Sequence, residues 1–265
     1  MDAFDKLVEI MRTLRGPGGC PWDQAQTLES LTPYTIEESY ELVQSIETKD
    51  WQELRKELGD LLFHIVFYAE IAREQGLFSI EEVAQAAVDK MIRRHPHVFG
   101  EESITDLDTL NKRWQALKAE ELKDKPTDRD TAWDAGIPGA LPALLWSYKL
   151  QERAANLGFE WHDIAPVWAK CAEEWQELKD AVATGNPAEI IDEYGDVLFA
   201  LANLSRFLDV HPEQALRQSC GKFRERLNEV QVQARKQDLN LQDLSDSELD
   251  ALWESAKREL ARRRG

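Results

Sequence analysis

The feature that most constrains this fold is a stretch at 170–196 that reads as two helices folded back on each other. Gly185 is typical of a helix end, and Asn186 followed by Pro187 is typical of a helix start. Glu189 lies three residues after Asn186. This is the spacing of a capping box, in which the later side chain accepts from the backbone N–H of the cap residue. The sequence therefore predicts a helical hairpin whose turn centres on Gly185.

Two pairs of acidic residues face each other across this hairpin. Glu174 and Glu177 precede the turn, whereas Glu193 and Asp196 follow it. Within each pair, the spacing of three places both carboxylates on one face of the helix. At 1.5 Å rise per residue, the two pairs lie at matching heights, about 12 and 16 Å from the turn. We therefore expect four carboxylates to converge in one small volume.

Such a cluster of like charges predicts a bound cation. Two like charges about 5 Å apart repel each other by roughly 3 kcal/mol at an effective dielectric constant near 20. A solvated acidic face would avoid this repulsion, but the apolar run at 197–204 places the carboxylates at the rim of a core. Oxygen ligands without Cys or His favour Mg2+, with Mn2+ as an alternative, over zinc. The expected metal ligands are Glu174, Glu177, Glu193 and Asp196.

The hairpin occurs a second time, nearer the N-terminus. The matching acidic residues lie 136 positions earlier and form a second possible metal set: Glu38, Glu41, Glu57 and Asp60. Thr32 and Pro33 predict the start of this hairpin's first helix, and Asp50 predicts the start of its second. Basic and aromatic residues further along repeat as well: Lys90, Arg94, Trp114 and Lys118 match Lys222, Arg226, Trp253 and Lys257. We infer that one helical domain has been duplicated.

The duplication predicts the fold class and the domain boundaries. Since no segment shows a sustained strand pattern, the expected class is all-α, with two tandem helical-bundle domains. The N-terminal domain is expected at 1–122 and the C-terminal domain at 143–265, joined by a linker at 123–142 that is rich in Pro, Gly and Asp. A helix that is apolar on most of its circumference must be covered on several sides. Each domain is therefore expected to pack against another copy, either in the same chain or in a homodimer, and a homodimer is the expected partner.

Net charge, hydropathy and cysteine usage limit the partners. A net charge of −18 argues against an extended nucleic-acid surface, because phosphate contacts need positive charge. No apolar run approaches the roughly 18 residues of a membrane span, so no membrane partner is expected. The three cysteines show no CxxC spacing, which predicts a reduced, cytoplasmic protein.

Taken in order, the motifs form a specific pattern. E-E-x-x-E is followed sixteen positions after its last residue by E-x-G-D, and then by K-x3-R and W-x3-K, and the whole set occurs twice. Together with HPHVF at 95–99, this pattern resembles the MazG family of all-α nucleoside triphosphate pyrophosphohydrolases over nearly the whole chain. The resemblance implies Mg2+-dependent hydrolysis of nucleoside and deoxynucleoside triphosphates to monophosphate and pyrophosphate, in house-cleaning of the nucleotide pool.

The resemblance also implies roles for individual residues. The implied catalytic residues are Glu173, Glu174 and Lys222, with Glu173 orienting or deprotonating a water molecule. The implied nucleotide-binding residues are Lys170, Glu189, Asp192, Lys222, Arg226, Trp253 and Lys257. Of these, Lys170, Lys222 and Arg226 would meet phosphate, and Trp253 with Lys257 would close over the nucleotide. Without the resemblance, Trp253 would read as ordinary core packing.

The two copies differ at positions that bear on catalysis. Tyr34 stands in the first copy where Lys170 stands in the second, and Pro96 ends the first copy's cationic helix. His64 takes the place of Ala200 and is expected to be a core residue rather than a metal ligand. We therefore expect the C-terminal copy to carry most of the catalysis, with the N-terminal copy a weaker site, a differently selective site or a structural partner.

Other functions remain open at this point. A related phosphoribosyl-ATP or dUTP pyrophosphohydrolase would share the metal cluster and differ in its base pocket. A di-iron carboxylate bundle would need Glu-x-x-His on two helices, and the second copy has no such motif in its hairpin. A non-enzymatic acidic interaction module would bind basic partners, and Mg2+ would then change neither stability nor nucleotide affinity.

Overall fold

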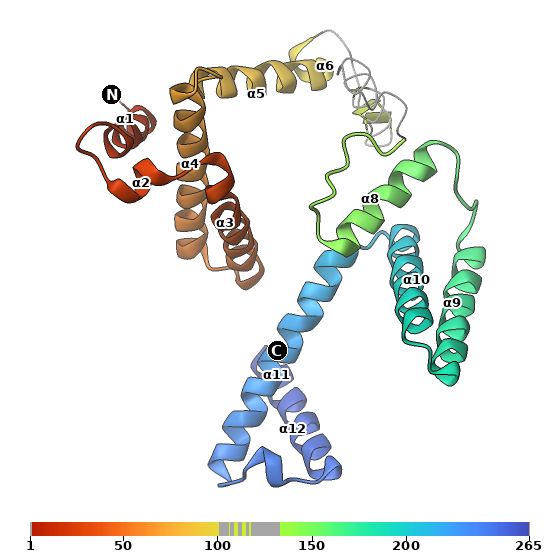
Figure 1. The fold of residues 1–265 in the computed structure, drawn as a ribbon. Helices are drawn as coiled ribbons and strands as arrows, with labels where there is room; N and C mark the ends of the chain where they lie inside the picture. Colours follow the sequence, from red (N-terminus) through yellow and green to blue (C-terminus); the bar gives the residue numbers. More distant parts are fainter. Residues whose placement is uncertain are drawn as a thin grey trace. The chain divides into compact units, whose positions relative to one another are not determined.

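The computed structural model describes residues 2–100, 106, 109–110, 113–114, 117 and 133–264. Within these ranges the chain forms helices, turns and loops and contains no strand, so the predicted all-α class is confirmed (Figure 1). The chain divides into two compact units, Met1–Glu120 and Glu121–Gly265. The predicted boundary at 122–123 falls outside the described residues and stays a prediction.

The first unit is built on the earlier of the two predicted hairpins. Its helices are α1 (Ala3–Arg15), α2 (Pro21–Ala25), α3 (Leu28–Thr48), α4 (Trp51–Glu74), α5 (Ile80–Arg94) and α6 (Pro96–Phe99). Helices α3 and α4 pack along each other as the hairpin, and α1 packs on α4. Their shared core includes Met11, Leu31 and Phe67, whose side chains are almost completely buried.

The predicted start of the first hairpin's outgoing helix was wrong. Helix α3 begins at Leu28, and Pro33 lies inside it. Thr27 is the cap: its side chain accepts from the backbone N–H of Ser30, and the Ser30 hydroxyl accepts from the backbone N–H of Thr27. This reciprocal cap satisfies backbone donors at the true start of the helix, so the N–H groups after Thr32 lie inside the helix and need no cap. The predicted cap of the returning helix, Asp50, is confirmed, because its carboxylate accepts from two backbone N–H groups of α4.

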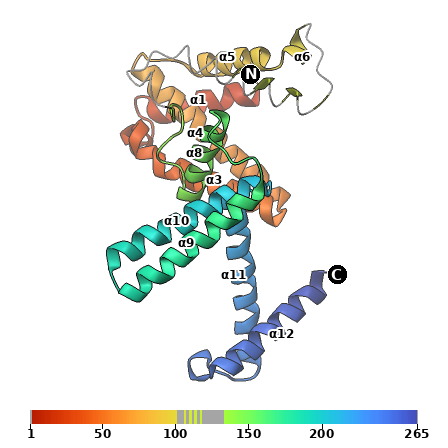
Figure 2. The ribbon, with the colours of Figure 1, turned by 90° about the vertical axis from the view of Figure 1, so that its right-hand side faces the viewer.

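The second unit repeats the hairpin and adds two helices after it. Its helices are α8 (Ala143–Asn156), α9 (Ile164–Thr184), α10 (Pro187–Phe207), α11 (Pro212–Lys236), a 3-10 turn (Leu241–Asp243) and α12 (Asp246–Arg264). Helices α9 and α10 pack along each other, α8 covers part of α10, and α12 folds back on α11. Figure 2 shows α11 leading away from the α9–α10 hairpin, so α11 and α12 form a separate arm of this unit.

The turn of the second hairpin follows the prediction at Gly185, Asn186 and Pro187, but Glu189 bonds the side chains of Thr184 and Asn186 rather than the Asn186 backbone N–H. Gly185 ends α9 in the left-handed conformation, with φ of 73°, where a side chain would be strained. Asn186 caps α10 by accepting from the backbone N–H of Ala188, and Pro187 occupies the first helical position. This local chemistry sets the register of the two helices and so brings their acidic residues to the same height.

No helix of the described residues is long and apolar enough to cross a membrane.

Candidate functional site

The C-terminal hairpin brings three carboxylates together. Glu174 and Glu177 come from α9 and Glu193 comes from α10, and one oxygen of each lies within 4.8 Å of the others. Glu174 is only 6% exposed, whereas Glu177 is exposed. Oxygens at this spacing from two helices are the donor set that a hard divalent cation prefers. The structure therefore presents a candidate cation site that faces solvent on one side.

Asp196 lies beside this triad rather than within it. Asp196 is not part of the group of carboxylates whose oxygens all lie within 4.8 Å of one another. It lines a small pocket together with Lys170 and Glu174. Burial first and then the charge of Glu174 raise the pKa of Asp196. The expected convergence of four carboxylates is thus seen for three, with the shorter Asp side chain next to them.

The carboxylates disturb one another's ionisation. Loss of hydration, followed by the charge of Glu174, raises the pKa of Glu177. Loss of hydration, followed by the charge of Asp196, raises the pKa of Glu193. Both shifts mean that the folded protein favours the protonated carboxyls. A divalent cation would remove this penalty, because it interacts favourably with every ionised oxygen at once.

Lys170 supplies a positive charge to the site. Its ammonium nitrogen lies 2.8 Å from an oxygen of Glu174 and 2.7 Å from an oxygen of Glu173. The hydrogen bonds to these two carboxylates raise the pKa of Lys170, so its charge is secure at neutral pH. Glu173, the expected water-orienting residue, is more than half exposed and is engaged with Lys170. In this arrangement Lys170 partly balances the charge of Glu174.

We expect Lys170→Met to make the protein more dependent on divalent cations for stability. The substitution keeps an unbranched side chain only one atom shorter, but it leaves Glu174 without its cationic partner. The melting temperature in EDTA should fall, and the increase on adding Mg2+ should exceed that of the parent protein. Differential scanning fluorimetry with and without Mg2+ measures both. An equal increase in parent and variant would show that Lys170 does not balance the cluster.

Glu189 and Asp192 lie on the exposed side of α10. Together with Asp196 they line a shallow hollow of about 430 Å3. The carboxylate of Glu189 accepts hydrogen bonds from Thr184 and Asn186 across the hairpin turn, at 3.1 and 2.8 Å. Glu189 is therefore a turn-stabilising residue here, and its expected contact with nucleotide stays a prediction.

The remaining predicted site residues lie on the separate arm. Arg226 of α11 lies over the ring of Trp253 of α12, 5.6 Å from its centroid, and Phe223 packs against the same ring. Lys257 forms an ion pair with Glu254 at 2.7 Å. Within the described residues, no hydrogen bond or ion pair joins these side chains or Lys222 to the acidic cluster. The structure brings Arg226 and Trp253 together but does not bring them to the carboxylates.

The N-terminal hairpin carries a second acidic triad. One oxygen each of Glu38, Glu41 and Glu57 lies within 4.8 Å of the others. Glu57 is 7% exposed, and its buried Oε2 has no hydrogen-bond partner in the described part of the chain. Burial and the neighbouring carboxylates raise the pKa of both Glu38 and Glu57. A buried carboxylate oxygen without a donor is an arrangement that suits a cation.

The residues that distinguish the first copy have mainly structural partners. His64 is buried, and its Nδ1 lies 3.0 Å from the hydroxyl of Thr35, which also contacts the hydroxyl of Tyr68 at 2.8 Å. Burial lowers the pKa of His64, as expected for a neutral core histidine. Tyr34 meets Trp22 edge-on at 6.0 Å. Trp114 donates its indole N–H to the backbone carbonyl of Arg94, whereas Lys118 lies outside the described residues.

Sequence reasoning missed a group of residues beside the C-terminal cluster. A small pocket of about 130 Å3 contains Lys170, Glu174 and Asp196, and its other walls include Trp161, Phe199 and Asn203. Asn203 is the one polar residue in the run VLFALANL, which is a signal that could have been noticed. A polar side chain inside an otherwise apolar helix face needs a partner in the folded protein.

Comparison with known proteins identifies the family. The family model described as the MazG nucleotide pyrophosphohydrolase domain matches residues 26–99 and again residues 166–231. The chain belongs to the MazG family. Both matches include an acidic hairpin, so the MazG domain occurs twice, as the inferred duplication requires.

Two curated MazG relatives match over nearly their full lengths. "Nucleoside triphosphate pyrophosphohydrolase/pyrophosphatase MazG" of Thermotoga maritima is 44% identical over 254 residues, covering 96% of this chain and 95% of the relative. "Nucleoside triphosphate pyrophosphohydrolase" of Escherichia coli K12 is 40% identical over 262 residues, covering 98% of both chains. The resemblance drawn from the motifs is therefore confirmed at the level of the family.

Proposed function

We propose that the chain is a Mg2+-dependent nucleoside triphosphate pyrophosphohydrolase, a hydrolase acting on acid anhydrides that releases monophosphate and pyrophosphate. The observation that carries this proposal is the convergence of Glu174, Glu177 and Glu193 within 4.8 Å, beside Lys170. The names of the MazG relatives supply the reaction. House-cleaning of the nucleotide pool, with deoxynucleotides among the substrates, is part of the proposal.

The side chains of the C-terminal hairpin have complementary tasks in this proposal. Glu174, Glu177, Glu193 and Asp196 would hold the metal ion. When bound, Mg2+ would neutralise the polyphosphate, polarise the bond to be broken and lower the pKa of a water molecule. Lys170, whose ammonium lies 2.8 Å from a carboxylate oxygen of Glu174, would contact a phosphate beside that site. Glu173, on the same helix and hydrogen-bonded to Lys170, would then orient the attacking water.

The cationic arm would complete the nucleotide site in the assembled protein. We place Lys222 and Arg226 at the phosphates, where their charges stabilise the departing pyrophosphate. Trp253 and Lys257 would cover the nucleotide from the same arm. Because the arm is separate from the hairpin within this unit, the proposal requires that α11 and α12 pack against a hairpin on assembly.

A homodimer is proposed on the basis of an apolar stripe on α10. Ile191, Tyr194 and Leu198 follow helical spacing and are 75%, 56% and 39% exposed. An exposed stripe of this kind indicates an interface. We expect Ile191→Asp to weaken self-association at least about tenfold, because it places a charge in that interface. Sedimentation velocity across a concentration series measures this. A parent protein that sediments as a monomer throughout would contradict the proposed dimer.

A substrate panel tests the proposal against its relatives. The protein should hydrolyse common ribo- and deoxyribonucleoside triphosphates when Mg2+ is present and should lose this activity in EDTA. Turnover of phosphoribosyl-ATP alone or of dUTP alone would identify one of the related pyrophosphohydrolases. If Mg2+ changed neither stability nor nucleotide affinity, the acidic hairpins would be a non-enzymatic interaction module instead.

A further inference from the structure

The acidic triad of the N-terminal hairpin has no positively charged partner. It consists of Glu38 and Glu41 of α3 and Glu57 of α4, two helices that run side by side in Figure 1. Among the described residues, no lysine, arginine or histidine forms an ion pair with any of these three carboxylates. Converging carboxylates without a counter-charge repel one another. The missing positive charge is therefore expected to come from a ligand.

Glu57 presents a free oxygen atom to this triad. It is only 7% exposed, and its buried Oε2 has no hydrogen-bond partner in the part of the chain that the structure describes. An unpaired buried carboxylate oxygen is costly, because it has lost its hydration and gained no donor. A bound group that donates N–H bonds or carries positive charge would remove that cost.

The C-terminal copy shows which chemical group balances the matching carboxylates there. The ammonium nitrogen of Lys170 lies 2.7 Å from an oxygen of Glu173 and 2.8 Å from an oxygen of Glu174. At the spacing of 136 residues that relates the two copies, the three matching positions are Tyr34, Glu37 and Glu38. The N-terminal copy thus keeps both carboxylates and lacks the ammonium between them.

Aromatic rings stand where the N-terminal copy lacks the lysine. Tyr34 and Glu38 are four residues apart in α3, so they share one face of that helix. The ring of Tyr34 meets the ring of Trp22 edge-on, with 6.0 Å between their centroids. Tyr34 and Trp22 are 43% and 50% exposed, so a ligand can reach them. Aromatic faces attract ammonium groups and cover the methylene chains that carry them.

Carboxylates beside aromatic rings favour an organic ammonium ion over a hydrated metal ion. Mg2+ retains several of its water molecules and gains little from an apolar ring. A primary ammonium donates three N–H bonds, and its alkyl chain can lie against the rings. A second ammonium group on the same chain would meet another carboxylate of the triad. A linear diamine or polyamine matches both features of this surface.

We propose that the N-terminal acidic triad binds a linear diamine or polyamine, with the alkyl chain of the ligand against Tyr34 and Trp22. One ammonium group meets Glu38 and the free oxygen of Glu57, and so supplies the charge that Lys170 supplies in the C-terminal copy. This binding requires no hydrolysis at either copy, so the proposal is independent of the proposed function. It gives the N-terminal copy a ligand of its own.

Tyr34→Lys tests the proposal, because it supplies the missing ammonium from the chain itself. The probe is putrescine, a four-carbon diamine, titrated calorimetrically into the full chain in EDTA and about 0.3 M KCl. The salt screens the general attraction of a protein with a net charge of −18. The parent should show saturable binding, and Tyr34→Lys should bind at least about tenfold more weakly. Tyr34→Phe keeps the ring and should bind within about twofold of the parent.

Glu57→Gln and Glu193→Gln are a matched pair, because each removes one charge from the triad of one copy. Putrescine affinity should fall at least about tenfold in Glu57→Gln and stay at the parent value in Glu193→Gln. Equal losses would indicate general attraction to acidic helices and would overturn the proposal. Absence of saturable binding by the parent, or unchanged binding by Tyr34→Lys, would also overturn it. Circular dichroism of each variant verifies that the helices are intact.

Discussion

Replacing Glu193 by glutamine is expected to lower kcat/KM for nucleoside triphosphate hydrolysis by about 1,000-fold. The substitution keeps the shape of the side chain but removes one of the three clustered carboxylates of the C-terminal hairpin. Metal polarisation of a phosphoryl group is worth several kcal/mol, and about 4 kcal/mol corresponds to this loss. Steady-state kinetics at saturating Mg2+ measures the effect, and Mn2+ binding should weaken in parallel.

Glu57→Gln is the matched change in the N-terminal copy, and its effect on turnover should stay below about tenfold, or 1.4 kcal/mol in the barrier. The physical reason is that Tyr34 replaces Lys170 there, so the first copy lacks the ammonium that contacts the cluster. Equal losses in the two variants would contradict the assignment of catalysis to the C-terminal copy. A larger loss for Glu57→Gln would reverse it.

The second large effect concerns stability and pH. Mg2+ at about 100 times its dissociation constant is expected to raise the melting temperature by about 5–10 °C at pH 8. At pH 5 the increase should be much smaller. In the metal-free protein the pKa values of Glu177, Glu193 and Asp196 are all raised, so protons compete with the metal for the same oxygens.

The sign of this effect follows from the raised pKa values. A carboxyl whose pKa is higher in the folded than in the unfolded state contributes most stability below its ordinary pKa, near 4, where it is protonated. That contribution to stability is lost as the pH rises through the raised pKa. Above the raised pKa, bound Mg2+ is expected to restore stability by balancing the ionised carboxylates. Scanning fluorimetry from pH 5 to pH 8 measures the trend. The control Glu177→Gln should show a flatter pH dependence without metal, and an equal Mg2+ effect at both ends would contradict the account.

Local chemistry made the hairpin predictable from sequence. Gly185 and Asn186 determine the turn through short-range conformational and capping preferences. The spacing of three residues within each acidic pair then places both carboxylates of the pair on the same face of their helix. These rules act within one or two helical turns, so they need no knowledge of the rest of the fold. The same kind of rule failed at Pro33, because the reciprocal cap at Thr27 lies earlier in the chain and starts the helix there.

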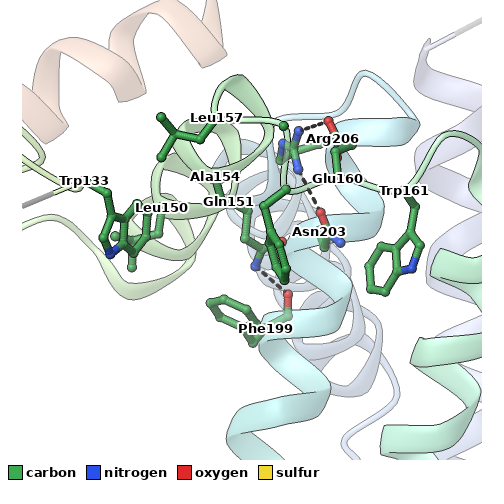
Figure 3. A pocket seen from close by; sticks show the side chains of 12 residues that line it. Trp133, Leu150, Gln151, Ala154, Leu157, Glu160, Trp161, Phe199, Asn203 and Arg206 are labelled. Atoms are coloured by element: carbon green, nitrogen blue, oxygen red, sulfur yellow. Dashed lines mark hydrogen bonds and ion pairs between the residues drawn. The ribbon is translucent and has the colours of Figure 1, made fainter.

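Tertiary arrangement accounts for what the sequence did not predict. Spacing alone could not show that Asp196 stands beside the triad, since this depends on side-chain length and on how α9 and α10 face each other. Nor could it place Arg226 and Trp253 on an arm of their own. The pocket of about 670 Å3 that is lined by Gln151 of α8 and Asn203 of α10 depends on the packing of two helices that are far apart in sequence (Figure 3). Position-by-position comparison of the two copies would have drawn attention to Asn203.

The most direct test of the central claim is product analysis. The protein is incubated with ATP, with and without Mg2+, and the products are separated by ion-exchange chromatography. The account predicts AMP and pyrophosphate in equal amounts, formed only when Mg2+ is present. ADP with orthophosphate would contradict the proposed bond cleavage, and product formation in EDTA would contradict the role of the acidic cluster as a metal site.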